Sequence, residues 1–193
     1  MRFICWRLRL LSLYLSLLLL LSFSLLAETN QPPKHLLFMR TLVGEREVKP
    51  NRSPLIDLIN RNVGAPLGSP YCAGTVYYSF DNTDTYYPQQ KSGLARSWVR
   101  KDSYTALDVL RGKYQIKAGD ILIWQKNNST QGHAGLANKD WQGISGETCE
   151  ANTSSGLKGS QYDGDGIWIK HRKIEPYNYK FRIKWITRWN YTG

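Results

Sequence analysis

The sequence predicts an α+β domain in which N-terminal helices pack on one side of an antiparallel β-sheet. Apolar residues recur at helical spacing in the part of the chain before Leu110. Beyond that point the pattern changes to strand-like runs separated by Gly, Asn, Ser and Asp. Helices first and strands afterwards is the order of an α+β domain, not of repeating βα units.

Residues 1–27 differ in kind from the rest and have the pattern of a secretory signal peptide. Three arginines precede an apolar run from Leu10 to Leu26, and the small residue Ala27 comes before a polar stretch. Cleavage after Ala27 predicts a secreted or periplasmic protein. The alternative is a retained anchor, because an apolar run of this length is at the lower limit for crossing a bilayer.

Residues 28–35 contain Pro32 and Pro33 and predict a short linker, and residues 36–193 predict a single domain. Removing the signal takes away three arginines and no acids, so the formal net charge falls from +11 to +8. A basic exported protein favours an anionic partner such as the cell envelope, although a generic basic surface would have the same composition. Export separates the chain from nucleic acid, and we expect a monomer without membrane contact once the signal is removed.

Three helices are expected before the strands. LLFMRTLVGEREV predicts the first, from Leu36 to a point before Pro50. Ser53 and Pro54 predict the cap and first residue of the second, which Gly64 closes. The third begins at Cys72, because its apolar side chains recur at i, i+3, i+4 and i+7, namely Ala73, Val76, Tyr77 and Phe80.

The remaining elements are shorter. Residues 81–101 predict a long loop with a turn near Gly93 to Trp98, and Ser103 to Leu110 predicts one more short helix. Five strand-like runs follow, namely GDILIWQ, GHAGLA, ISGETCEAN, GIWIKHRKI and FRIKWITRW.

Cys72 is a candidate nucleophile because of its position at a helix N-terminus. The helix dipole and the unpaired amides of the first turn favour a thiolate there, and the same amides suit a developing oxyanion. Many cysteines at such positions are inert. In an oxidising compartment Cys72 and Cys149 are also an even pair that a disulfide would use.

A thiolate nucleophile needs a histidine, and His133 is the best placed. It lies between Gly132 and Gly135 at the start of an apolar run, where backbone and solvent can approach its ring. His35 falls in the linker, and His171 lies in the basic run IKHRK, which indicates an exposed strand. The alternative for His133 is a histidine packed in a strand without a chemical role.

Glu150 and Asn152 are candidates for orienting the imidazole. Two residues apart in a strand, they share a face, while Cys149 and Ala151 point the other way. That alternation predicts that Cys149 is a buried neighbour outside the site. The alternative for the two polar residues is an ordinary solvated strand end.

Four strings resemble the CHAP family of cysteine, histidine-dependent amidohydrolases and peptidases, in order and in spacing. They are GSPYCAGTV at 68–76, AGDILIW at 118–124, GHAGLA at 132–137 and CEANT at 149–153. The resemblance covers most of the chain that follows the predicted signal, residues 28–193, and implies a papain-like fold. Carried over, it implies Cys72 as nucleophile, His133 as base and then acid, Glu150 as orienting carboxylate and Asn152 as a further polar member.

The resemblance also implies an activity. It is that of a secreted thiol hydrolase of peptidoglycan, either an N-acetylmuramoyl-L-alanine amidase or a peptidoglycan endopeptidase. No metal is expected, because neither the two cysteines after the signal nor the three histidines cluster at ligand spacing, and no cofactor is required. Gly74 and Tyr71 depart from the residues common in the family, and neither removes a catalytic group. Two alternatives stay open, a non-catalytic wall-binding module and an exported cysteine protease that acts on proteins.

Overall fold

The computed structural model describes residues 31–83, 91–156 and 164–188. The predicted signal peptide at 1–27 therefore lies outside the described residues. Within the described ranges, no helix has the length and apolar character needed to cross a membrane. Residues from Pro33 onward form one compact unit.

The first described helix, α2 (Lys34–Thr41), begins inside the segment predicted as a linker. His35 is fully buried there, its Nε2 lies 3.0 Å from the carbonyl oxygen of Gly119, and its ring stacks on Phe80 with centroids 4.0 Å apart. Burial lowers the pKa of His35 to about 4, so the ring is neutral. The folded unit thus starts before the predicted boundary at residue 36, because His35 contributes to the core.

The next two helices begin where local chemistry predicts. In α3 (Pro54–Asn62) the Ser53 hydroxyl accepts the backbone N–H of Ile56 at 3.1 Å, and Pro54 is the first helical residue. Gly64 follows the helix with φ of 69°. The third helix, α4 (Cys72–Asp81), starts at Cys72 as predicted. Two short elements come later, the 3₁₀ helix η1 (Ala95–Trp98) and α5 (Ala106–Leu110).

In the described parts of the chain, six strands form one antiparallel sheet in the order β1-β6-β2-β3-β4-β5. Each of the five predicted runs forms a strand, and the two-residue β1 was not predicted. The α+β class with an antiparallel sheet is therefore confirmed. The strands are β1 (Tyr104–Thr105), β2 (Ile121–Lys126), β3 (Gly132–Ala137), β4 (Ser145–Thr153), β5 (Gly166–Lys173) and β6 (Phe181–Thr187).

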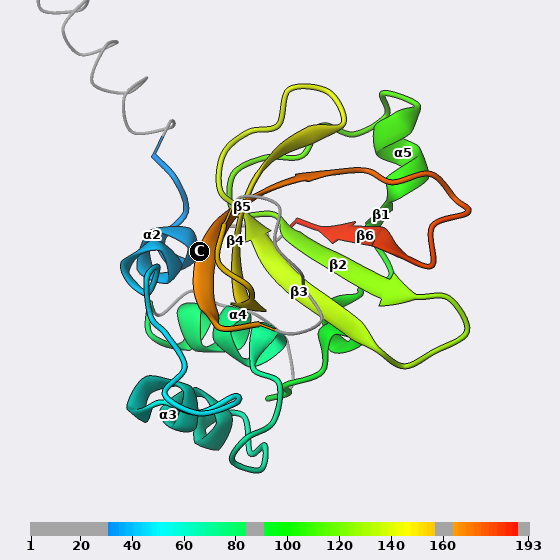
Figure 1. The fold of residues 1–193 in the computed structure, drawn as a ribbon. Helices are drawn as coiled ribbons and strands as arrows, with labels where there is room; N and C mark the ends of the chain where they lie inside the picture. The colour runs from blue at the N-terminus through cyan, green and yellow to red at the C-terminus, as the bar shows by residue number, and fades with distance from the viewer. Residues whose placement is uncertain (1–30, 84–90, 157–163, 189–193) are drawn as a thin grey trace, which may run out of the picture. The chain divides into compact units, whose positions relative to one another are not determined.

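The sheet separates two apolar clusters because successive side chains of a strand point to opposite faces. In β2, Ile121 and Ile123 pack with the core of α2, α3 and α4, whereas Leu122 and Trp124 pack with the other cluster. Figure 1 shows α2, α3 and α4 grouped on one side of the sheet, and α5 beside β1 and β6. Helix α4 contacts β3 and β4, which brings its first turn to the two strands that carry His133 and Glu150.

Candidate active site

Tyr71, the residue before Cys72, interacts with two other segments of the chain. Tyr71 is fully buried, and its hydroxyl donates to Glu47 Oε1 at 3.0 Å. The same hydroxyl accepts the backbone N–H of Asn152. Burial, together with the nearby Glu47 charge, raises the pKa of Tyr71 well above its usual value, so the group stays a neutral phenol. Tyr71 thereby ties the start of α4 to the end of β4.

Cys72 is a free thiol with 5% of its surface exposed. Burial by itself would raise the pKa of this thiol. The charge of the nearby His133 ring acts in the opposite direction, as do the backbone amides of Ala134 and Ala73, and the net effect lowers the pKa of Cys72. The first turn of α4 adds the favourable end of the helix dipole. The site therefore favours a thiolate beside an imidazolium.

His133 lies on β3 and is fully buried, which differs from the solvent-accessible ring expected from its flanking glycines. Its Nε2 is 3.0 Å from Glu150 Oε2, and Trp124 packs edge-on against the ring with centroids 5.3 Å apart. Within the described ranges its Nδ1 has no hydrogen-bond partner, and the charge of the nearby Cys72 side chain acts on the ring. Burial alone would lower the pKa of His133, but Cys72 and Glu150 raise it to about 9.

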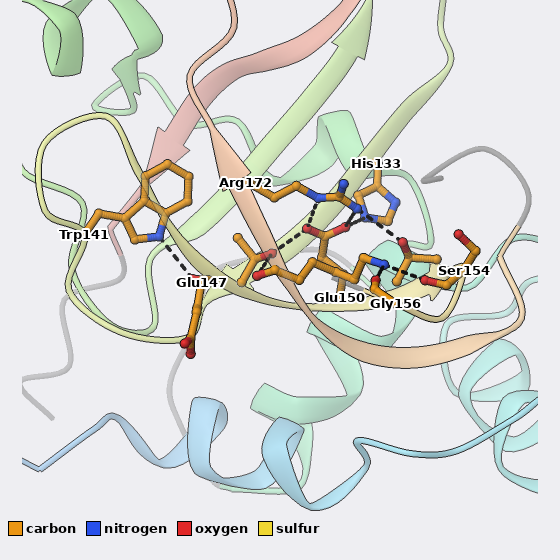
Figure 2. Close-up of polar contacts among 10 residues, drawn as sticks. His133, Trp141, Glu147, Glu150, Ser154, Gly156 and Arg172 are labelled. Carbon is orange, nitrogen blue, oxygen red and sulfur yellow. Dashed lines mark hydrogen bonds and ion pairs between the residues drawn. The ribbon is translucent and has the colours of Figure 1, made fainter. Parts of the chain in front are cut away.

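The Glu150 carboxylate on β4 is fully buried, and among the described residues three side chains donate hydrogen bonds to it (Figure 2). Besides the His133 ring, Arg172 donates Nε to Oε1 at 2.8 Å and Nη2 to Oε2 at 2.9 Å, and the Thr148 hydroxyl donates to Oε1 at 2.5 Å. Burial would raise the pKa of Glu150, yet Arg172 and His133 hold it well below its usual range. Glu150 is thus an ionised acceptor that orients the imidazole.

Asn152 does not join this hydrogen-bonded group. It has left-handed backbone geometry, with φ of 55°, at a register shift between Ala151 and Thr153 in the pairing of β4 with β5. This irregularity interrupts the alternation that predicted a shared face for Glu150 and Asn152. In the described part of the chain the Asn152 side chain makes no hydrogen bond, and its backbone N–H serves Tyr71 instead.

Cys149 lies outside the site, as the alternation predicts. It is fully buried in the cluster under α2 and α4, and its Sγ lies 3.8 Å from the carbonyl oxygen of Met39. Burial raises the pKa of Cys149 to about 12, so it remains a protonated thiol. Both Cys72 and Cys149 are free, and the nucleophile candidate is not blocked by a bridge.

Gly135 makes room for the Glu150 side chain on the neighbouring strand. A Cβ at this position would lie 2.8 Å from Glu150 Cγ and 2.9 Å from the carbonyl oxygen of Cys149. We expect Gly135→Ala to displace the carboxylate and to lower the free energy of unfolding by about 1–3 kcal/mol, as overpacked cores do. Chemical denaturation measures the change. Gly93→Ala is the control, because its Cβ would meet Val63 Cγ2 at an ordinary 3.5 Å, and equal losses in the two variants would contradict this account.

Two inward-pointing cations were missed in the sequence, Arg172, which binds Glu150, and Lys170. The run IKHRK indicates an exposed strand, and His171 is indeed exposed. The side chains on either side of His171 point inward, however. Lys170 is fully buried, and its ammonium binds the carbonyl oxygens of Ser154, at 2.6 Å, and Gly156. Successive side chains of a strand point to opposite faces. This alternation over residues 170–173 places Lys170 and Arg172 on the face opposite to His171.

The fold and the site together define an α+β domain with a buried cysteine, histidine and glutamate brought together from α4, β3 and β4. No family model, curated protein or solved structure matches the chain. In the portion that the structure describes, no group of His, Cys, Asp and Glu is arranged to hold a metal ion. The chemistry available from these residues is that of a thiolate with an imidazolium and its carboxylate acceptor.

Proposed function

We propose that this chain is a secreted cysteine hydrolase that cleaves an amide bond of the peptidoglycan peptide, as its resemblance to the CHAP family implies. The observation that carries the proposal is the pairing of Cys72 at the start of α4 with His133, whose other ring nitrogen is held by Glu150 at 3.0 Å. The lowered pKa of Cys72 and the raised pKa of His133 are those of a nucleophile paired with its acid.

In the first half of the reaction the Cys72 thiolate attacks the carbonyl carbon of the amide and forms a tetrahedral intermediate. The first turn of a helix leaves backbone N–H groups without intrahelical partners, and these suit the developing oxyanion. His133 then gives its proton to the leaving nitrogen as the C–N bond breaks. The amine departs, and the acyl group remains on Cys72 as a thioester.

In the second half the neutral His133 takes a proton from water as the water oxygen attacks the thioester carbon. The C–S bond breaks, the acid product leaves, and the thiolate and imidazolium are restored. Throughout, the Glu150 carboxylate accepts the other ring N–H, which fixes the tautomer and stabilises the imidazolium. Each turnover consumes one amide bond and one water.

Wall peptide is the substrate class that best suits both the resemblance and the charge. A net charge of +8 on residues 28–193 favours a substrate rich in carboxylates. The cut bond is either the sugar-proximal amide or an amide within the peptide, and the products distinguish the two.

The proposal is tested by incubating the purified protein under reducing conditions with peptidoglycan from several wall types and measuring new amino groups, beside Cys72→Ala. We expect release by the wild-type protein alone, and mass spectrometry of the products then identifies the bond. Co-sedimentation with the wall without release would support the binding module instead. Cleavage of an unfolded protein substrate but of no wall peptide would support the exported protease.

The rate should depend on pH through the two reacting groups. Hydrolysis needs the Cys72 thiolate and the His133 imidazolium together, so kcat/KM is expected to form a plateau between their two pKa values. On the alkaline side the rate should fall through about pH 9, where His133 loses its proton. On the acid side it should fall only below the pKa of an ordinary thiol, because the pKa of Cys72 is lowered. A rate that keeps rising through pH 9 would contradict an imidazolium acid.

A further inference from the structure

We infer that Arg172 is a positioning residue of the proposed catalytic site: its guanidinium holds the Glu150 carboxylate against His133 and balances the charge of the buried group. The inference deepens the proposed function and rests on the assigned roles of Cys72 and His133. It does not depend on which amide bond is cut.

Arg172 binds both oxygens of the Glu150 carboxylate, and this pair of hydrogen bonds is called the fork. Nε binds one oxygen of Glu150 at 2.8 Å and Nη2 binds the other at 2.9 Å, while the second oxygen is also the one that meets His133. Figure 2 shows the Arg172 side chain and the His133 ring reaching the same carboxylate. A planar bidentate pair resists rotation of the carboxylate, which a single hydrogen bond does not. Arg172 thereby fixes the oxygen that orients the imidazole.

Arg172 is well covered, and it reaches beyond Glu150. Its side chain is 13% exposed, against 0% for Glu150, so the pair is only weakly screened by solvent. Nη2 also lies 3.3 Å from the Thr153 hydroxyl, at the end of β4. Arg172 therefore contacts the end of β4, at Thr153, as well as the Glu150 carboxylate.

Counting the buried charges shows why a cation is needed. In the reactive form, the Cys72 thiolate and the Glu150 carboxylate are negative, and the His133 imidazolium and the Arg172 guanidinium are positive. Among these four groups, removal of Arg172 leaves two negative charges against one positive, which a desolvated site disfavours.

Of the described residues, Lys170 and Cys149 are further titratable groups near Glu150, and neither replaces Arg172. Lys170, the neighbouring inward cation of β5, directs its ammonium to the carbonyl oxygens of Ser154 and Gly156. Cys149, on the same strand as Glu150, points to the opposite face and is a neutral thiol. The fork on the carboxylate is thus made by Arg172.

Loss of the fork should lower the fraction of Cys72 that is present as thiolate, because the His133 imidazole would lose its ionised partner. A buried carboxylate without its arginine either takes up a proton or turns away from His133. In both cases the ring loses the acceptor of its Nε2–H, and the thiolate–imidazolium pair shifts toward thiol and neutral imidazole. The fraction of Cys72 present as thiolate at neutral pH then falls, while strongly alkaline pH still ionises the thiol.

Alkylation of Cys72 by iodoacetamide measures this fraction without any substrate, with peptide mapping by mass spectrometry to follow that cysteine alone. We expect Arg172→Met to react about tenfold more slowly than wild type at pH 7, because most of its Cys72 is then protonated, and at a similar rate at pH 10. Arg172→Lys keeps the charge without the fork and should lie between the two. Slowing by the same factor at both pH values, or no slowing, would overturn the inference.

A second variant separates an effect through Glu150 from a general one. Glu150→Gln should also slow alkylation at pH 7, and adding Arg172→Met to it should change the rate by less than about twofold, because the negative carboxylate that Arg172 positions is already lost. Independent tenfold effects in the double variant would overturn the inference. If circular dichroism shows that Arg172→Met is unfolded, Arg172→Lys takes its place in the test. Alkylation of Cys72 in Arg172→Lys at the wild-type rate at pH 7 would then overturn the inference. Since no wall peptide is used, failure here is distinct from failure of the proposed function.

Discussion

Cys72→Ser is expected to lower the rate of wall-peptide hydrolysis by roughly 10³-fold or more while leaving the fold intact. Serine has nearly the same shape, but its hydroxyl is not ionised by an adjacent imidazolium as a thiol is, so attack on the amide carbon is lost. Initial rates of amine release compare the variant with wild type.

The matched control is Cys149→Ser, the other free cysteine of the described chain. Its thiol is protonated and faces Met39, so we expect it to keep most of the activity and to lose stability, because a buried hydroxyl replaces a thiol. Cys72→Ser should change the free energy of unfolding by no more than about 1 kcal/mol. Equal activity in wild type and Cys72→Ser would refute the assigned nucleophile.

Glu150→Ala is expected to damage both activity and stability. Its removal leaves the Arg172 guanidinium and His133 Nε2 in the interior without their shared acceptor. Breaking one side of a buried ion pair costs about 3–5 kcal/mol of unfolding free energy. Activity should fall roughly 10³-fold or more, because the imidazole loses its orienting group. Denaturant titration and initial rates measure the two effects.

Glu147→Ala provides the comparison on the same strand. This side chain is 35% exposed and pairs with Lys139 at the surface, so its loss should cost about 1 kcal/mol or less and leave the rate near wild type. If the Glu150 and Glu147 variants lost similar amounts of stability, the buried network would not be the source of the effect.

The parts of the site that were predicted from the sequence depend on local periodicity. The spacing after Cys72 predicts a helix start, and the alternation in ETCEAN separates Glu150 from Cys149; the structure has both features. His133 was selected from the local sequence around each histidine, and the structure places it beside Cys72 and Glu150. These are features of a single element, which a sequence displays directly.

The features that the sequence did not predict depend on contacts between different helices, strands and loops. The partnership of Arg172 with Glu150 requires knowing that β5 pairs with β4 and that a long side chain crosses several residues of register. The geometry of Asn152 follows from an irregularity in that same pairing, and a period of two carries no sign of it. His35 looks like linker sequence, and it becomes core only when the loop at Gly119 folds against α2.

The most direct test of the central claim is to alkylate Cys72 with iodoacetamide at pH 6 in graded amounts and to measure amine release from peptidoglycan by each sample. At this pH the protonated thiol of Cys149 should stay unreacted, which peptide mapping checks. We expect activity to fall in direct proportion to the fraction of Cys72 modified and to vanish when modification is complete. Undiminished release by protein whose Cys72 is fully alkylated would contradict the claim, as would no release from any wall type by folded protein with a free Cys72 thiol.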